Sequence, residues 1–241
     1  MSKTNYVIAT WTGKRRKGND PHTRDTTYYV REHLETLKHL KHDLSQITVV
    51  APTFVGEPLK VTQYLESLDG LIVGNTPVVL MRRENRGHSY GSYSHVFDRY
   101  RSNFDYYFFV EDDYVFAQDH FDTVMISLYE QKQCGFLCCL VTRFGQTATD
   151  PGLLHAAISN GLASAKSLQK VWDLKGELPS SAFTTKYHCQ SQIQFSQGFI
   201  EAGLTLCDFT EHYSVLFNNT GILESYGRGK LMMRPLQFNG M

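Results

Sequence analysis

Five aromatic or apolar residues run directly into three carboxylates in Tyr106-Tyr107-Phe108-Phe109-Val110-Glu111-Asp112-Asp113-Tyr114. A continuous apolar run of this kind is typical of a strand that is buried on both faces of a sheet. Adjacent carboxylates raise one another's pKa and cost stability at the end of such a strand. A divalent cation offsets that cost, because Mg²⁺ and Mn²⁺ prefer hard oxygen ligands. The motif therefore predicts a metal site, with a solvated acidic turn as the alternative.

Shorter apolar runs with strand character lie on both sides of this segment, at 6–10, 47–51, 78–81, 135–141, 153–159 and 204–209. Between them, apolar residues recur at helical spacing within 25–44, 58–68, 93–100, 121–128, 164–172 and 193–202. Asp119 and Ser164 are predicted to cap two of these helices, and 144–152 and 178–185 read as loops. The alternation predicts an α/β fold with a mixed, mostly parallel sheet and helices on both faces. Ligands of such sheets bind beyond the carboxyl ends of the strands.

The overall composition is that of one globular domain spanning residues 1–241. The chain carries 24 basic and 24 acidic residues, a balance that argues against a nucleic-acid binder. Its longest apolar stretch, Phe136 to Val141, is far shorter than a membrane span needs, and no signal peptide opens the chain. Five cysteines without a CxxC pair are typical of a reduced protein, so a cytoplasmic location is expected.

Two further strand ends carry groups suited to a nucleotide. After the first strand, Thr10, Trp11 and Thr12 are followed by a basic stretch that includes Lys14 and Arg15. An aromatic face can stack on a base, and basic side chains can hold phosphates. The spacing is not that of an NTPase phosphate loop, and a solvated basic loop is the alternative.

A second basic group, Arg82, Arg83 and Arg86, is expected after the third strand. Because parallel strands end at the same edge of a sheet, these groups and the carboxylates are predicted to converge there. Together they suit a metal-bridged nucleoside diphosphate better than any one of them does.

The order of these motifs resembles that of the GT-A nucleotide-sugar-dependent glycosyltransferases, in the branch whose DxD motif reads Glu-Asp-Asp. The resemblance runs from residue 6 to about 220 and includes a glycine-containing segment, 155–164, near the donor sugar. It implies Asp113 as a metal ligand, Asp112 as the ribose contact, and Glu111 in support of one or both. It also implies that Thr10, Trp11 and Thr12 line a uridine pocket. A fainter resemblance is to small glycosyltransferase domains of large DNA viruses that decorate capsid glycans, which would place the protein in the host cytoplasm.

One departure from the family concerns the general base. Many inverting members place Glu-Asp at the start of a helix that ends in Ala-Gly, but here the aligned residues are Ser191 and Gln192. Neither side chain can deprotonate a hydroxyl at neutral pH. Three alternatives remain: a retaining reaction in which the leaving phosphate is the base and Gln192 lies near the anomeric centre; an inverting reaction with Asp150 or Glu177 as base; or donor binding without turnover.

A histidine could complete the metal site. His212, beyond the 204–209 run, resembles the C-terminal histidine that does so in several family members, and imidazole suits Mn²⁺ beside carboxylates. His188 is a weaker candidate, and an ordinary structural role is the alternative for both. His33, His39 and His42 lie on a predicted helix far along the chain from the motif, and structural roles are expected for them.

The expected function is that of a hexosyltransferase. It would use Mn²⁺ or Mg²⁺ to move a sugar from a nucleoside diphosphate sugar to a hydroxyl of a glycan or glycoprotein. A UDP-sugar is the expected donor. Lys14, Arg15 or Arg86 would bind the phosphates, and the acceptor would enter over 144–152 and 178–185. Two alternatives stay open: a sugar-phosphate nucleotidyltransferase, and a non-catalytic module that binds nucleotide sugars or glycans. No nucleic acid partner and no transmembrane segment are expected.

Overall fold

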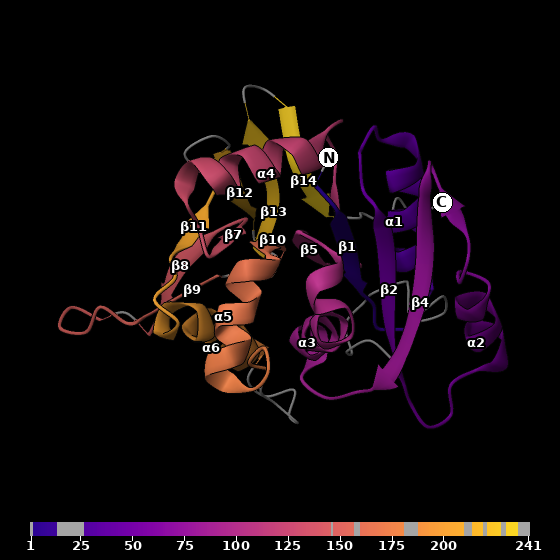
Figure 1. Cartoon of the computed structure of the whole chain (residues 1–241), viewed down its shortest axis with the longest axis horizontal. Coiled ribbons are helices and arrows are strands. Elements are labelled where there is room, and N and C mark those ends of the chain that lie inside the picture. Colours follow the sequence, from indigo (N-terminus) through magenta and orange to yellow (C-terminus); the bar gives the residue numbers. More distant parts are fainter. Residues whose placement is uncertain are drawn as a thin grey trace.

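A central sheet organises the fold (Figure 1). The structure is a computed structural model that describes residues 2–13, 27–145, 147–156, 160–180, 188–209, 214–218, 221–227 and 230–235. In spatial order the strands of this sheet are β11 (Leu206–Asp208), β7 (Phe136–Cys138), β10 (Gly161–Ser164), β5 (Tyr106–Glu111), β1 (Thr4–Ala9), β2 (Gln46–Thr53), β4 (Thr76–Glu84) and β3 (Ile72–Val73).

Most neighbouring strands in this sheet run parallel. The pairs β1–β2, β1–β5, β2–β4 and β7–β11 are parallel, whereas β10 is antiparallel to both of its neighbours and β3 is antiparallel to β4. In register, Ala9 of β1 lies opposite Val50 of β2 and Glu111 of β5. The carboxyl ends of β1 and β5 are therefore level with each other.

Helices cover both faces of the sheet, as the sequence predicts. On one face, α1 (Tyr28–His39), α2 (Leu59–Glu66) and α4 (Phe121–Lys132) pack on Tyr6, Ile8, Phe108 and Val110. On the other face, α3 (His88–Tyr100), α5 (Ala165–Lys175) and α6 (His188–Glu201) pack on Val7, Tyr107 and Phe109. Successive residues of β1 and β5 thus enter opposite cores, which is why the runs 6–9 and 106–110 are continuously apolar or aromatic. A short 3₁₀ turn, Arg101–Asn103, follows α3.

The pairing of the strands outside the central sheet was not predicted, although one of these strands lies within the predicted run 153–159. The run 135–141 is divided between β7 and β8 (Val141–Phe144), and β8 forms a hairpin with β9 (Leu153–Ala156), so the predicted loop 144–152 is the turn of that hairpin. A second sheet contains β12 (Ser214–Asn218), β13 (Gly221–Gly227), β14 (Lys230–Pro235) and β6 (Tyr114–Phe116). The predicted run 204–209 contains β11, but no strand was predicted after it, so β12, β13 and β14 were missed. Pairing with the distant β6 is a long-range event that no local pattern reveals.

The N-termini of α5 and α4 are capped in different ways. Ser164 caps α5 as predicted, because its hydroxyl accepts the Ser167 N–H at 3.1 Å. Asp119 does not cap α4; the cap position is His120, in the left-handed region at φ 59°. The Asp119 carboxylate instead accepts the backbone N–H of Lys41 at 2.9 Å and so ties this turn to the end of α1. No helix in the described ranges is both long and apolar enough to span a membrane.

Candidate functional site

The ends of β1 and β5 are joined by one buried carboxylate. Asp112, which is 4% exposed, accepts a hydrogen bond from the Thr10 hydroxyl at 2.6 Å and another from the Trp11 N–H at 3.3 Å. Its own N–H donates to the carbonyl of Ala9 at 3.2 Å. The structure thus brings together Thr10, Trp11 and the Glu111–Asp113 run, as the sheet argument predicts. A ribose contact for Asp112 stays a prediction.

A histidine that was expected to be merely structural lies directly behind this carboxylate run. His33 of α1 is fully buried, and its Nδ1 is 3.1 Å from the backbone carbonyl of Asp112, while its Nε2 is 2.9 Å from the Tyr6 hydroxyl. A carbonyl can only accept, so Nδ1 carries the proton and Nε2 accepts from Tyr6. Burial lowers the pKa of His33 to about 4, so the ring is neutral. The sequence feature that could have indicated this role is a histidine at one of the apolar positions of a predicted helix.

Glu111 is anchored by two residues that the sequence analysis did not single out. Its carboxylate accepts the Ser89 hydroxyl of α3 at 2.7 Å, and its N–H donates to the Asn160 side chain at 2.8 Å. Asn160 is fully buried, and its Nδ2 has no hydrogen-bond partner within the described part of the chain. Both residues come from elements distant in sequence, and a lone serine or asparagine carries no pattern that would have marked it.

The carboxylates at the end of β5 are of the chemical type that a divalent ion uses together with oxygens of a bound substrate. Across the described ranges, no group of three or more histidine, cysteine, aspartate or glutamate residues could hold a metal ion. Mg²⁺-type sites commonly use only one or two carboxylates and take further oxygens from a bound phosphate. Glu111 and Asp113 are half-buried at the end of β5 and supply two such groups. His212, the other predicted metal ligand, lies outside the described residues, as do Lys14 and Arg15, which were predicted to bind the phosphates.

The indole ring of Trp11 packs against the segment that follows β1. Its ring lies 5.4 Å from that of Phe54, and a Cβ at Gly13 would come within 2.2 Å of the indole. Glycine is therefore required where the chain passes the ring. Thr12 is buried, and its hydroxyl lies 3.5 Å from the carboxylate of Glu57. Their predicted part in a base pocket stays a prediction.

The three arginines do not form one cluster beyond a strand. Arg82 and Arg83 lie inside β4, and Arg82 pairs with Glu57 at 2.5 Å. Arg83 is 9% exposed and donates to Ser92 and to the carbonyls of Glu84, Arg86 and His88. Burial lowers the pKa of Arg83 to about 10, and its guanidinium holds the turn between β4 and α3 in shape. Only Arg86 lies in that turn, as predicted.

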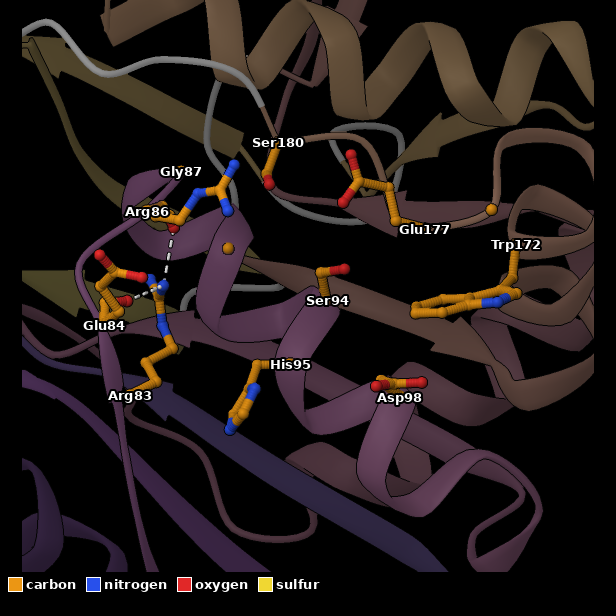
Figure 2. A pocket seen from close by; sticks show the side chains of 12 residues that line it. Arg83, Glu84, Arg86, Gly87, Ser94, His95, Asp98, Trp172, Glu177 and Ser180 are labelled. Carbon is orange, nitrogen blue, oxygen red and sulfur yellow. Dashed lines mark hydrogen bonds between the residues drawn. The ribbon is translucent and has the colours of Figure 1, made fainter.

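A pocket of about 500 Å³ opens beside this turn (Figure 2). Arg86 and Gly87 line one end, Ser94 and Asp98 of α3 form one wall, and Trp172 and Glu177 form the other. Gly87 has φ 72°, and a Cβ there would lie 2.6 Å from the Ser180 hydroxyl. Side chains from α3 and from the end of α5 thus enclose a hollow that the sequence analysis did not foresee.

The two predicted catalytic residues occupy different settings. Asp150 lies in the turn of the β8–β9 hairpin, which projects away from the body of the protein (Figure 1), and its carboxylate accepts the Gly152 N–H at 2.8 Å. The structure does not bring Asp150 to the Glu111–Asp113 run. Gln192 lies in the first half of α6, where its backbone carbonyl accepts the Ser196 hydroxyl at 2.7 Å. Ser191, beside it, is buried.

The sequence matches no family model and no curated protein. Solved structures share its fold. A mannosyltransferase from Pyrobaculum calidifontis in complex with GDP-Man and Mn²⁺ is similar with a TM-score of 0.52 and 10% identity, over 86% of this chain and 54% of that one. TarS from S. aureus is similar with a TM-score of 0.50 and 11% identity, over 86% of this chain and 35% of that one.

A CMP:2-keto-3-deoxy-manno-octonic acid synthetase complexed with CTP is similar with a TM-score of 0.51 and 13% identity, over 86% of this chain and 89% of that one. The chain thus spans about a third of TarS and about half of the mannosyltransferase. The likeness shows a Rossmann-like α/β fold of the GT-A kind, with a mostly parallel sheet. Enzymes named for two different reactions use that fold.

Proposed function

We propose that this protein is a metal-dependent glycosyltransferase that moves a sugar from a nucleoside diphosphate sugar to a hydroxyl of a glycan or glycoprotein. A UDP-sugar is the proposed donor. The observation that carries the proposal is the bond between Thr10 and Asp112, because it sets an aromatic and hydroxyl turn beside a carboxylate run at one sheet edge. Those groups suit a base, a ribose and a metal-bound diphosphate in that order.

Most of the predicted residues have a role in this proposal. Thr10, Trp11, Thr12 and Asp112 would bind the base and ribose, and Arg15 and Arg86 would bind the phosphates. Glu111 and Asp113 would hold Mn²⁺ or Mg²⁺, with His212 as a further ligand. The ion, when bound, supplies positive charge that stabilises the diphosphate leaving group.

The proposed reaction retains the anomeric configuration. The acceptor oxygen forms a bond to the anomeric carbon, the bond from that carbon to the phosphate oxygen breaks, and the acceptor proton passes to that phosphate oxygen. Two observations support this choice over inversion: Ser191 and Gln192 stand where inverting relatives have acids, and Asp150 caps its own turn on the projecting hairpin. Gln192 would position the anomeric centre through its amide.

A nucleotidyltransferase acting on sugar phosphates is the second candidate. The fold likeness to the CTP-bound synthetase, which covers 89% of that chain, favours it. The turn that would discriminate most directly, Thr12 to Arg16, lies largely outside the described residues. A non-catalytic donor-binding module is the third, and it would bind a nucleotide sugar without turnover.

Thermal unfolding with UDP, GDP and CDP, each with and without Mn²⁺, tests the proposal. A ligand that binds only the folded state at about 100 times its Kd stabilises by roughly 2.7 kcal/mol. We expect a rise in Tm with UDP that requires Mn²⁺, and release of UDP from a UDP-sugar when acceptor is present. Absence of any nucleotide-dependent shift would overturn the proposal. Release of pyrophosphate from UTP or CTP and a sugar phosphate would establish the second candidate instead.

A further inference from the structure

We infer that the pocket between α3 and the end of α5 binds an uncharged saccharide. Its assignment as a distal unit of the acceptor rests on the proposed glycosyl transfer. The pocket volume of about 500 Å³ lies within the range that proteins use for small ligands. We call this hollow the α3–α5 pocket.

Small residues on one face of α3 create the α3–α5 pocket. Gly87, Gly91, Ser94 and Asp98 follow one another at intervals of four, three and four, so they share a face of the helix and its preceding turn. Trp172 and Glu177 form the opposite wall (Figure 2). A Cβ at Gly87 would meet the Ser180 side chain, whereas a Cβ at Gly91 would lie 1.8 Å from the Arg86 carbonyl, so Gly91 lets the turn before α3 pack closely against the helix.

The indole of Trp172 is fixed without a ligand. Its ring lies 5.8 Å from that of Phe97, and the guanidinium of Arg101 stacks over it at 4.2 Å. Arg101 in turn pairs with Asp98 at 2.7 Å. A ring held in this way contributes apolar surface at little entropic cost when a ligand binds.

The polar groups around Trp172 match the needs of a sugar. The apolar C–H groups of a pyranose pack on an aromatic ring. Its hydroxyls donate hydrogen bonds to carboxylates, and they can both donate to and accept from the hydroxyl of a serine. Asp98 and Glu177 supply acceptors, and the Ser94 hydroxyl, on a residue 8% exposed, supplies a donor and an acceptor. One aromatic ring with several convergent polar groups is the composition expected of a small-molecule site.

The charge balance of the α3–α5 pocket selects an uncharged ligand. Three acids line it, Glu84, Asp98 and Glu177, against two arginines, Arg83 and Arg86, and the charge of Asp98 is already paired with that of Arg101. Arg83 already donates to Ser92 and to three backbone carbonyls. A polyphosphate would meet the acids, and a cation would meet the arginines, so a neutral polyhydroxyl compound is favoured over both.

The α3–α5 pocket lies along α3 from the carboxylate run. Ser89, in the first turn of α3, donates to Glu111 at 2.7 Å. Asp98 is nine residues further along the helix, a distance of about 13 Å at a rise of 1.5 Å per residue. A sugar beside Asp98 and Trp172 is therefore too far away to receive the transferred unit. It would be a distal unit, and the acceptor would be an oligosaccharide.

Tryptophan fluorescence tests this inference directly. The chain has two tryptophans, so in a Trp11→Phe variant all indole emission comes from Trp172. The variant is titrated with maltotriose, chitotriose and mannotriose, and with spermidine and tripolyphosphate as charged probes. Calorimetry of the unmodified chain with the same five compounds covers the case in which Trp11→Phe does not fold.

The inference predicts saturable binding of at least one neutral oligosaccharide. Glu177→Gln should weaken that binding about tenfold or more, as loss of a charged hydrogen-bond acceptor does. Asp173→Asn is the matched control, because Asp173 is an exposed acid in the last turn of α5, four residues before Glu177 and outside the pocket, and should leave affinity unchanged. Binding of no oligosaccharide, an equal loss in both variants, or binding of only a charged probe would overturn the inference.

These outcomes are separable from those of the proposed function. A Mn²⁺-dependent UDP shift without oligosaccharide binding would leave the transferase proposal standing and remove the α3–α5 pocket from it. Oligosaccharide binding that depends on Glu177, without any nucleotide shift, would keep the saccharide site and remove the transferase.

Discussion

His33 donates its Nδ1–H to the backbone carbonyl of Asp112 across 3.1 Å, with both residues buried. This bond couples α1, on one face of the sheet, to the carboxylate run at the end of β5. Its geometry requires a neutral imidazole, because Nε2 accepts from the Tyr6 hydroxyl. The candidate site therefore depends on the protonation of a residue that no substrate would touch.

The first prediction concerns stability against pH. The pKa of His33 is about 4 in the folded protein and near 6.5 when exposed, so the unfolded chain binds the extra proton between those values. Stability from this group is complete above about pH 6.5 and is lost as pH falls towards 4, by about 3 kcal/mol at most. Urea unfolding at a series of pH values measures the slope.

His33→Asn should flatten that slope while lowering stability at neutral pH, since the amide does not titrate. His39→Asn is the control, because His39 lies on the same helix but is exposed beside Glu35. An unchanged pH slope in His33→Asn would contradict the assignment.

The second prediction concerns the bond that joins β1 to β5. Thr10→Val keeps the side-chain shape but removes the hydroxyl that donates to the buried Asp112 carboxylate. We expect a loss of about 1–3 kcal/mol in the free energy of unfolding, because a charged acceptor is left short of a donor. Thr10→Ser keeps the hydroxyl and should lose much less. Equal stabilities of the valine and serine variants would show that the bond contributes little.

The third prediction concerns the metal. Asp113→Ala should abolish the Mn²⁺ dependence of UDP binding and leave the fold intact, because Asp113 is half-buried at a turn rather than within the core. Thermal shift with UDP, with and without Mn²⁺, measures it, and circular dichroism checks the fold. Asp119→Ala serves as a control acid outside the site. Retained Mn²⁺-dependent affinity in Asp113→Ala would remove Asp113 from the metal site.

The fourth prediction concerns Trp11. If its ring stacks on the base, Trp11→Ala should weaken UDP binding by about 1–3 kcal/mol, the range for base stacking on aromatic side chains. Isothermal titration calorimetry gives the affinity. Trp172→Ala, which removes the other indole, should leave UDP affinity unchanged. A similar UDP affinity in Trp11→Ala and the unmodified protein would exclude stacking.

The fifth prediction separates the candidate catalytic groups. Gln192→Ala should reduce turnover and barely change UDP affinity, whereas Asp150→Asn should leave turnover unchanged because Asp150 caps a turn on the projecting hairpin. Initial rates with a UDP-sugar measure both. Product anomers resolved by NMR report the stereochemistry. A loss of turnover confined to Asp150→Asn, with an inverted product, would reverse the assignment.

Local sequence patterns predicted much of the architecture. The apolar run before Glu111 predicted β5, helical spacing predicted α1 and α5, and Ser164 marked the start of α5, because burial periodicity and capping act between near neighbours. The convergence of Thr10 with the carboxylate run also followed from strand ends in a parallel sheet. The hairpin β8–β9 and the sheet containing β12 did not, since their pairing depends on partners that a local pattern cannot identify.

Only the tertiary structure decided what individual polar groups do. Thr10 and Asp112 are 102 residues apart, and His33 and Asp112 are 79 apart, so their bonds exist only after the sheet and α1 have packed. Packing also made Arg83, predicted as a member of a basic group suited to a diphosphate, the buried support of a turn. The α3–α5 pocket arose in the same way, because residues of α3 and residues near the end of α5 line it together. Residue type sets which interactions are possible, and the packing of distant elements selects which of them form.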